Sequence, residues 1–544
     1  MTLQSICARV ASACVAVSFA TSTSADVRVG STTVLGPFIG HHAPLHPDNA
    51  QARIEFYGTD LGWTYVHKGQ LQFLFGDTWK NERGEPINKL HDDVFGAIDL
   101  REWPDGTRIS AARVPTVKLA TEGRSSSLAA LDAGAPSEGL KTPVGGFSDG
   151  EHEFAIFITG KPQACRADAD CSSGRECETS VGYFGEKPGT EAGLTLACEE
   201  GSTGCVADTL FDKSNQAIKN TGMCADRTSS VWTDSPSGRT SATTMEHIVA
   251  LRDANNPSKY RKLTNWHTTK FINVATRTVD DFDPTRARQD YRNTTSQPST
   301  KQRVLLWGRP EFIGVNAKNQ TLAMYFAYAD IPRAPDFQWK PHFFAGTNAD
   351  GTPRFSNSER DAQAVDLDST QAGVQVREVH DTVQHMSAVW LEPLRQWVMF
   401  YGGGINDVPQ PPIFPDCGLL EVFARTECKH VDQGNGAIRV RTAKDPWGPW
   451  SPPQDVFVAG DAKKRPLEAQ YAAGGVLHHP ECTGEKCQSR SPSLPKGDYG
   501  WLYGANIIEP WTIADANGVD VIWNASTWNP YRVILLRTRL EKIN

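Results

Sequence analysis

The chain has 544 residues, a formal net charge of −8 and 39% hydrophobic residues, with 15 Trp and 23 Phe. Its charges are spread along the sequence without a block of lysine and arginine, so the electrostatic footprint of a nucleic-acid or anionic-membrane binder is missing. A chain of this length can bury a large core. We expect a monomeric globular protein whose partner is neither nucleic acid nor a membrane.

The first 25 residues have the pattern of a secretory signal peptide. A short segment with one arginine precedes an apolar run of about a dozen residues, and small residues lead to Ala25. No later segment approaches the roughly 20 uninterrupted apolar residues of a membrane helix. We expect residues 1–25 to be removed and the mature protein, from Asp26, to be secreted or periplasmic.

Short runs rich in β-branched and aromatic residues follow one another along the chain, bounded by Gly, Asp, Asn and Pro. Long amphipathic helical patterns are scarce, and strands do not alternate with helices, which predicts an all-β chain of mostly antiparallel strands. The runs are ARIEFYGTD, QLQFLFGD, HEFAIFIT, EHIVALRD, RVLLWGR, LAMYFAYA, SAVWLE, QWVMFYGG, AIRVRTA, GVDVIWNAS and YRVILLRTRL.

The expected strands are grouped in a longer repeat along the sequence. A strand with Gly or Trp, a turn and a second strand return near 55–80, 143–160, 303–330, 385–404 and 498–540. Repeated small antiparallel sheets with such marks are typical of a β-propeller. The sequence predicts a five-bladed β-propeller that occupies residues 26–544 as one domain.

A cysteine-rich segment, residues 161–225, interrupts this repeat. It is poor in apolar residues, so disulfides would have to supply the constraint that a core cannot. An even number of cysteines in an exported chain favours disulfides, whereas the lack of CxxC spacing and of histidine in the cluster disfavours zinc. We expect a disulfide-rich insertion within the propeller, with its connectivity and its role, substrate gating or surface attachment, left open.

Several motifs in order resemble a known family. They are GTDLGW, LFGDTW, LLWGRPEFIG, RVRTAKDPWGPWSPPQDVF, YGANIIEPW and WNASTWNPYRVILLRTRL, and they look like the secreted bacterial family catalogued as domain of unknown function 4185. The resemblance covers about Gly30 to Leu540 apart from the cysteine insertion. It implies a fold similar to five-bladed propeller glycoside hydrolases. Some relatives are endo-acting arabinanases that cleave D-arabinofuranose polymers of mycobacterial cell walls.

Two segments depart from the family pattern. Relatives often carry Arg-Ser-Asn where this chain has KLHDDVFGAIDL, and many place a glutamate where it has VQHMSAVWLE. The resemblance implies an exported glycoside hydrolase that is endo-acting on a furanose-containing polysaccharide such as D-arabinan. The missing acids motivate the alternative of a non-catalytic carbohydrate-binding propeller. A polysaccharide lyase with a His/Tyr or His/Arg pair is a third reading.

Glycoside hydrolysis needs one carboxyl group as proton donor and a second as nucleophile or base. In a propeller, acids at the ends of inner strands converge although they are distant in sequence. Asp60, placed after the expected strand IEFYGT, is similar in position to the first-blade aspartate of five-bladed glycosidases and is expected to be the nucleophile or base. Asp77 is expected either as a second acid or as support for Asp60. Both could instead be turn residues.

Further acids and polar residues are expected at the same site. Asp93 is preferred over Asp92 because it would share a strand face with Phe95, and a solvated loop pair is its alternative. Glu311 is an acid from a distant blade, and Arg309 beside it would bind a hydroxyl or orient a carboxylate. A surface salt bridge is the alternative for this pair.

The remaining candidates would bind substrate. His385 is expected as an acid/base or sugar hydrogen-bond donor, with a structural histidine as the alternative. Indole faces stack on sugar rings, which makes Trp63, Trp79 and Trp528 candidates, and Tyr531 is assigned to substrate contact from the family match. Trp307 and Trp501 are candidates for the same stacking role, although most of these five tryptophans are expected in blade cores and one or two in the groove.

No cofactor is expected. The GHHAPLHPDNA segment contains His41, His42 and His46 but lacks the helical frame of a zinc protease, so no metal site is predicted there. Structural calcium elsewhere is left open. The chain also lacks the GxSxG, P-loop and GxGxxG motifs.

Overall fold

The computed structural model describes most of the predicted strands and leaves several connecting segments undescribed. The described residues are 27–40, 43–49, 56–80, 93–121, 131–132, 142–158, short pieces between 164 and 239, 243–268, 270–289, 291–293, 302–309, 324–331, 339–365, 385–402, 437–458, 502–527 and 532–543. Within these residues, no helix is long and apolar enough to cross a membrane.

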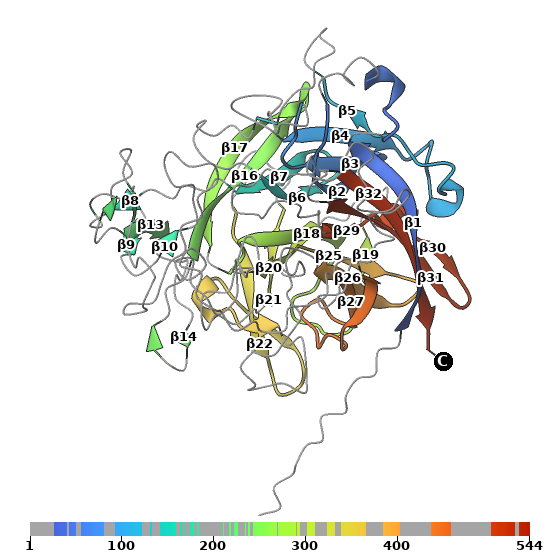
Figure 1. Ribbon diagram of the computed structural model, residues 1–544. Helices are drawn as coiled ribbons and strands as arrows, with labels where there is room; N and C mark the ends of the chain where they lie inside the picture. The colour runs from blue at the N-terminus through green and yellow to red at the C-terminus, as the bar shows by residue number, and fades with distance from the viewer. Residues whose placement is uncertain are drawn as a thin grey trace, which may run out of the picture.

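Five antiparallel sheets surround a common centre, so the chain forms a five-bladed β-propeller, as predicted (Figure 1). Blade 1 consists of β2 (Leu61–His67), β3 (Gln70–Phe75), β4 (Val94–Asp99) and β5 (Lys118–Leu119). Blade 2 consists of β6 (Pro143–Ser148), β7 (Glu153–Ile158), β16 (Thr243–Asp253) and β17 (Asn256–Thr268), with β10 (Gly182–Tyr183) paired to β16. Blade 3 consists of β18 (Asn273–Asp280), β19 (Arg292–Asn293), β20 (Gln302–Arg309), β21 (Met324–Asp330), β22 (His342–Thr347), β23 (Pro353–Ser356) and β24 (Ala364–Val365).

The last two blades complete the ring. Blade 4 consists of β25 (Met386–Leu391), β26 (Gln396–Gly402), β27 (Ala437–Ala443) and β28 (Gln454–Val458). Blade 5 consists of β29 (Leu502–Ile507), β30 (Ile513–Asp515), β31 (Gly518–Thr527), β32 (Arg532–Lys542) and β1 (Val27–Gly40). Short 3₁₀ helices lie at η2 (Gly106–Arg108), η4 (Glu359–Asp361) and η8 (Glu509–Trp511).

The two ends of the chain close the propeller. The N-terminal strand β1 pairs antiparallel with β32, from Val27 opposite Lys542 to Gly40 opposite Arg532. Figure 1 shows the two strands side by side, blue next to red. The inner strands pack in the order β2, β6, β18, β25, β29 and back to β2. Blade 5 therefore contains β1 and β32, the first and the last of the described strands, and their pairing closes the ring between blade 5 and blade 1.

Each gap between neighbouring blades holds a hydrophobic core, and the five cores form a closed ring. A blade is thus buried on both faces, so its strands need apolar residues at consecutive positions rather than in strict alternation. Along β3, Phe73 packs toward blade 5 and Leu74 toward blade 2. This explains the continuous apolar runs such as QLQFLF that marked the strands in the sequence.

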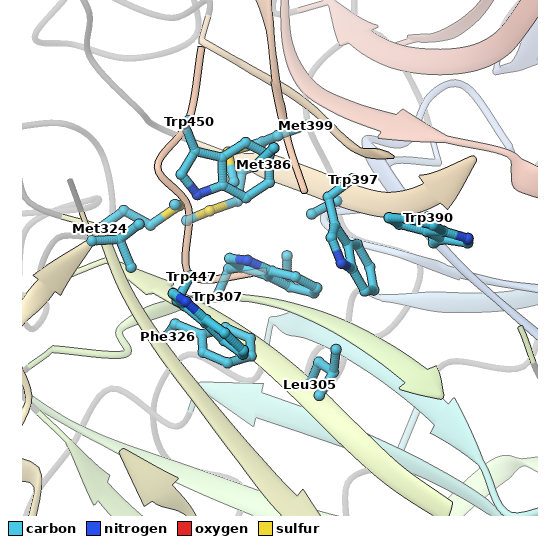
Figure 2. Close-up of a cluster of buried hydrophobic side chains, with 14 of the residues drawn as sticks. Leu305, Trp307, Met324, Phe326, Met386, Trp390, Trp397, Met399, Trp447 and Trp450 are labelled. Atoms are coloured by element: carbon cyan, nitrogen blue, oxygen red, sulfur yellow. The ribbon is translucent and has the colours of Figure 1, made fainter. Parts of the chain in front are cut away.

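The core between blades 3 and 4 gathers tryptophans (Figure 2). Trp307 and Trp397 have ring centroids 5.2 Å apart, and the PWGPW loop after β27 adds Trp447 and Trp450 to the same core. Trp307 is fully buried and donates its indole N–H to the carbonyl of Pro446 at 2.8 Å. The tryptophans of LLWGRP and PWGPW are therefore packing residues of two neighbouring blades.

The first hairpin differs from its prediction. The expected strand IEFYGT ends before Asp60, but the described part of it, Phe56–Asp60, holds only an isolated bridge between Gly58 and Trp79. The hairpin is instead β2 and β3, joined at Lys68 and Gly69, which both have positive φ (47° and 76°) as a two-residue type I′ turn requires. Asp60 therefore precedes the inner strand rather than following a strand.

Part of the cysteine-rich segment is described. Strands β8 (Ala164–Cys165), β9 (Arg175–Glu178) and β13 (Gly222–Asp226) form a small sheet that lies outside the ring of blades in Figure 1. The pair β11 (Leu210–Phe211) with β12 (Ala217–Ile218) also belongs to the segment, and the pair β14 (Asp234–Ser235) with β15 (Gly238–Arg239) follows it in the chain. In chain order this segment lies between β7 and β16 of blade 2. The predicted disulfides stay a prediction.

Candidate functional site

Polar and aromatic residues from four of the five blades, and a proline from blade 2, occur at one end of the inner strands. Because every inner strand runs in the same direction along the ring, the residues at which these strands begin share that end. They are Asp60 directly before β2, Pro143 at the start of β6, Asn273 at the start of β18, His385 directly before β25 and Tyr503 at the second position of β29. This end is called the start face below.

The backbone after Asp60 has an unusual conformation. Leu61 (φ 61°) and Gly62 (φ 89°) both lie in the left-handed region, which costs energy for leucine. Polar side chains of blade 5 hold it there. The N–H of Leu61 donates to Ser526 Oγ at 2.6 Å, and its carbonyl accepts from Asn524 Nδ2 at 2.9 Å. Asn506 Nδ2 donates to the carbonyl of Gly62 at 3.0 Å.

The carboxylate of Asp60 is fixed from two sides and only 6% of the residue is exposed. The hydroxyl of Tyr503 donates to its Oδ2 at 2.6 Å. On the other side lies Gly76, where an added Cβ would be closer to Asp60 Oδ1 than van der Waals contact allows. A glycine at position 76 thus makes room for the carboxylate, and a tyrosine from blade 5 orients it.

His385 lies beside this pair. Its ring centroid is 5.8 Å from those of both Tyr503 and Trp63. Burial, together with the positive charge of Arg309, lowers the pKa of His385 to about 4. Its imidazole is therefore neutral near pH 7, where it can accept or donate a hydrogen bond but does not carry a proton for general-acid catalysis.

Trp63 and Arg309 have more buried positions than a groove-lining role would suggest. The indole N–H of Trp63 donates to the carbonyl of Pro143 at 3.0 Å, which ties blade 1 to blade 2. Arg309, the last residue of β20, is 1% exposed and lies opposite Asn273. Both residues still influence the site, since Trp63 packs against His385 and the positive charge of Arg309 lowers the pKa of His385.

Asp77 and Trp79 lie just after β3 and are partly exposed. Around them, Thr78 and Thr59 join their hydroxyls at 2.8 Å, and the N–H of Trp79 donates to the carbonyl of Gly58 at 2.8 Å. These bonds extend the hairpin past β3 and hold the segment that leads into Asp60. The role of Asp77, as a second acid or as support for Asp60, stays a prediction.

Asp93 lies directly before β4 and is buried. The β3–β4 register pairs Phe75 with Val94, so its continuation brings Asp93 level with Gly76, whose N–H in turn donates to the carbonyl of Asp60 at 3.1 Å. With strands about 4.8 Å apart, the Cα atoms of Asp60 and Asp93 are then about 9–10 Å apart. Blade 1 therefore brings two acids to the two sides of one glycine.

The other expected site residues, Glu311, Trp528 and Tyr531, lie outside the described residues, as do Asp92, Trp501, His41 and His42. Among the described residues, no three His, Cys, Asp or Glu side chains group as metal ligands would. The sequence analysis did not assign Tyr503 to the site. Tyr503 is the first residue of the motif YGANIIEPW, but only the closed ring shows that its hydroxyl reaches Asp60 of blade 1.

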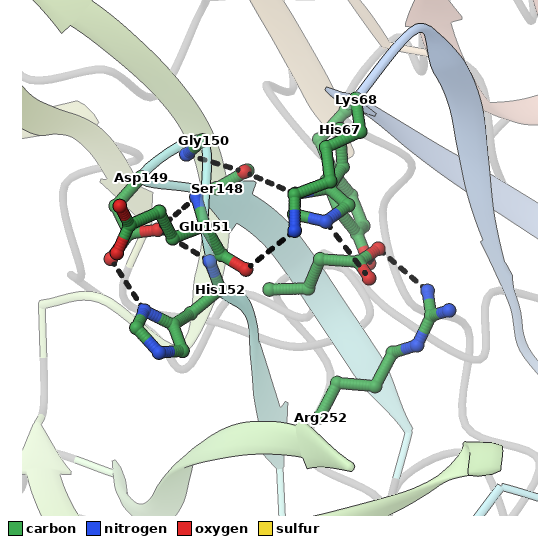
Figure 3. Close-up of polar contacts among 10 residues, drawn as sticks. His67, Lys68, Ser148, Asp149, Gly150, Glu151, His152 and Arg252 are labelled. Atoms are coloured by element: carbon green, nitrogen blue, oxygen red, sulfur yellow. Dashed lines mark hydrogen bonds and ion pairs between the residues drawn. The ribbon is translucent and has the colours of Figure 1, made fainter. Parts of the chain in front are cut away.

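A second polar cluster lies at the opposite ends of β2 and β6 (Figure 3). His67 Nδ1 is 2.8 Å from Ser148 Oγ, and its Nε2 is 3.6 Å from a carboxylate oxygen of Glu153. Glu153 also pairs with Arg252 at 2.6 Å. Burial lowers the pKa of His67 to about 4 and raises that of Glu153. The contacts of His67 join blade 1 to blade 2, and the Glu153–Arg252 pair lies within blade 2, so we assign the cluster to stability.

Comparisons with known proteins add little to this geometry. No family model and no curated protein matches the chain. A solved α-L-arabinofuranosidase from Podospora anserina is similar at 8% identity and a TM-score of 0.33, over 95% of this chain and 98% of that one. An exo-β-1,3-galactanase from Phanerochaete chrysosporium has 8% identity and a TM-score of 0.33, over 93% and 64%. A Trypanosoma rangeli sialidase has 7% identity and a TM-score of 0.30, over 94% and 60%.

Likeness at these scores carries no argument about activity. The propeller assignment rests on the sheet order, the inner-strand packing and the β1–β32 closure. The resemblance to the family of unknown function stays a prediction from the sequence motifs.

Proposed function

We propose that the protein is a glycoside hydrolase with its active site on the start face and with Asp60 as nucleophile or base. The observation that carries the proposal is the buried Asp60 carboxylate, held by the Tyr503 hydroxyl at 2.6 Å where the inner strands begin. A buried carboxylate that a hydrogen bond holds in one orientation is the arrangement that a nucleophile or base requires.

In the proposed reaction, the C1–O bond of a glycosidic linkage breaks. A protonated acid gives its proton to the leaving oxygen, and the oxygen of water ends on C1, either directly or after a covalent step on Asp60. Asp93 and Asp77 are the proposed acids in blade 1, and Glu311 is kept from the sequence analysis. The separation of the two carboxyl groups, about 5–5.5 Å for a retaining and 6.5–9.5 Å for an inverting enzyme, would decide between these two routes.

The substrate class comes from the motif resemblance. We propose an endo-acting enzyme on a furanose-containing polysaccharide such as D-arabinan, exported by the signal in residues 1–25 and acting as a monomer without a cofactor. Neutral His385 would bind a sugar hydroxyl, with the edges of Trp63 and Trp79 beside it.

A panel of polymers tests the hydrolase. Arabinan, arabinogalactan, fructan and uronate polymers are incubated with the wild type and with Asp60→Asn, and released oligosaccharides are scored. Asp60→Asn is expected to lose most of the activity, about 10³-fold or more for a lost nucleophile or base. Equal release by both proteins would refute the role of Asp60. Binding without release by either protein would instead favour the carbohydrate-binding alternative.

A polysaccharide lyase is the second candidate, because His385 packs against Tyr503 within the field of Arg309. In that reaction a base removes the C5 proton of a uronate, the C4–O bond breaks as an acid gives a proton to the leaving oxygen, and a C4=C5 double bond forms without water. Arginine would neutralise the uronate carboxylate. Products from uronate polymers would absorb in the ultraviolet, and the absence of this absorbance would exclude the lyase.

A further inference from the structure

A cavity of about 470 Å³ lies on the side of the propeller away from the start face. Its lining comes from three blades. Blade 3 contributes Arg288 after β18, blade 4 contributes Arg395 between β25 and β26 and Lys444 after β27, and blade 5 contributes Lys542 at the end of β32. Each position follows a strand that runs away from the start face, so this cavity is separate from the Asp60 site.

The lining is rich in positive charge. Arg288, Arg395 and Lys444 are exposed and Lys542 is half-buried, so four cations surround one cavity in a chain whose net charge is −8. The neighbouring acid Asp445 accepts at Oδ1 from the backbone N–H of Arg288 and from the hydroxyl of Tyr291, so it offsets part of the charge of Arg288 and leaves an excess of cations. Clustered cations around a low-dielectric cavity focus a positive potential and attract anions.

Backbone conformation gives a second observation. Among the described residues, five non-glycine residues have positive φ, and two of them are Arg288 (53°) and Arg395 (51°). Each such position costs free energy that other contacts must offset, and strained residues concentrate at binding sites. Here both arginines that line the cavity have this conformation, although they come from different blades.

The remaining lining is mixed. The side chains of Leu394 and Ile543 give apolar surface above the buried Trp390, and the amide of Gln396 is a hydrogen-bonding group, whereas the amide of Gln289 bonds the backbone of its own loop. The volume lies in the usual range of about 300–1,000 Å³ for small-molecule sites. Apolar surface for a ring face, an amide for hydroxyls and cations for an acidic group match the parts of an acidic sugar.

We propose that this cavity binds an acidic sugar residue through its carboxylate or phosphate group. Arg288, Arg395, Lys444 and Lys542 hold the anionic group, while Leu394 and Ile543 contact the ring. The site is independent of the proposed hydrolase activity, because none of these residues belongs to the start face.

Calorimetric titration of the mature chain with D-glucuronate, inorganic phosphate and D-glucose tests the proposal. The pocket variant is Arg395→Gln with Lys444→Gln, both exposed. The matched control is Lys259→Gln with Lys340→Gln, which removes two exposed cations outside the cavity. Thermal unfolding of each variant checks that it folds. Asp60→Asn is included and is expected to bind as the wild type does.

We expect saturable glucuronate binding that weakens about tenfold or more in the pocket variant and less than about twofold in the control. Binding should weaken with added salt, and glucose should not bind. Tighter binding of phosphate than of glucuronate at the same residues would assign phosphorylated sugars rather than uronic acids. No saturable glucuronate or phosphate binding, equal loss in both double variants, or glucose binding as tight as glucuronate binding would overturn the proposal.

Discussion

The Tyr503 hydroxyl donates a 2.6 Å hydrogen bond to Oδ2 of Asp60, although the two residues lie 443 positions apart. One belongs to the last blade and the other precedes the inner strand of the first blade. The bond therefore exists only because the propeller ring is closed. If blades 1 and 5 moved apart, the proposed nucleophile or base would lose the group that orients it.

Tyr503→Phe is expected to reduce kcat by about 10- to 100-fold, since a buried charged acceptor loses a hydrogen bond worth about 1–3 kcal/mol. The acid limb of the pH–rate profile should move to higher pH, because the lost bond favoured the ionised carboxylate. Tyr65→Phe is the matched control, as its hydroxyl contacts Glu153 on the far side of the blade. An equal loss in both variants, with no movement of the acid limb, would contradict the positioning role.

Gly76→Ala is expected to reduce activity more than stability. Its Cβ would clash with Asp60 Oδ1 and lie 2.9 Å from Leu61 Cδ1, so the carboxylate must move away from Tyr503. Gly96→Ala is the control, because its Cβ would clash with Val117 in the core of the same blade and leave Asp60 untouched. We expect the control to lower the melting temperature and keep kcat. The prediction fails if Gly76→Ala keeps full activity.

The stability of the protein is expected to fall between about pH 6.5 and pH 4. The pKa of His67 is lowered to about 4 in the folded chain, so in this window the unfolded chain binds a proton that the folded chain does not. The neutral His67 side chain contributes fully to stability above about pH 6.5, the pKa of histidine in the unfolded chain. This contribution, up to about 3 kcal/mol, is lost as the pH falls toward 4. His385, with its pKa also at about 4, adds a loss in the same direction.

His67→Gln isolates the first contribution. An amide can still contact Ser148 but does not titrate, so the variant should show a flatter dependence of unfolding free energy on pH. Denaturant titrations at pH 7, 5.5 and 4 measure the difference. The raised pKa of Glu153 acts in the opposite direction in both proteins and cancels in the comparison. Parallel curves for the two proteins would exclude His67 as the source.

Trp307→Phe is expected to destabilise the protein by about 2–4 kcal/mol without changing KM. The substitution leaves a cavity in the blade 3–4 core and removes the donor to the Pro446 carbonyl. Denaturant unfolding measures the first effect and initial rates on the polymer found in the panel measure the second. A raised KM with unchanged stability would return Trp307 to the list of sugar-stacking residues.

The sequence by itself determined the strand content and the number of blades. Consecutive apolar residues in runs such as QLQFLF reflect sheets that are buried on both faces, and this local pattern repeats once per blade. Asp60 is predicted from the sequence by its place in the first hairpin and by the family resemblance; the structure shows it buried directly before β2, and its catalytic role stays a prediction. Its place before β2, however, depended on the type I′ turn at Lys68 and Gly69.

Tertiary structure alone decided which residues meet. Tyr503, His385 and Arg309 are distant from Asp60 in the chain, and only the order of inner strands around the ring brings them to the start face. The ring also brings together the four cations of the cavity on the side away from the start face, which come from three blades. Local patterns specify strands because side-chain periodicity is a property of neighbouring residues. Sites between blades follow from ring closure, which no short stretch of sequence contains.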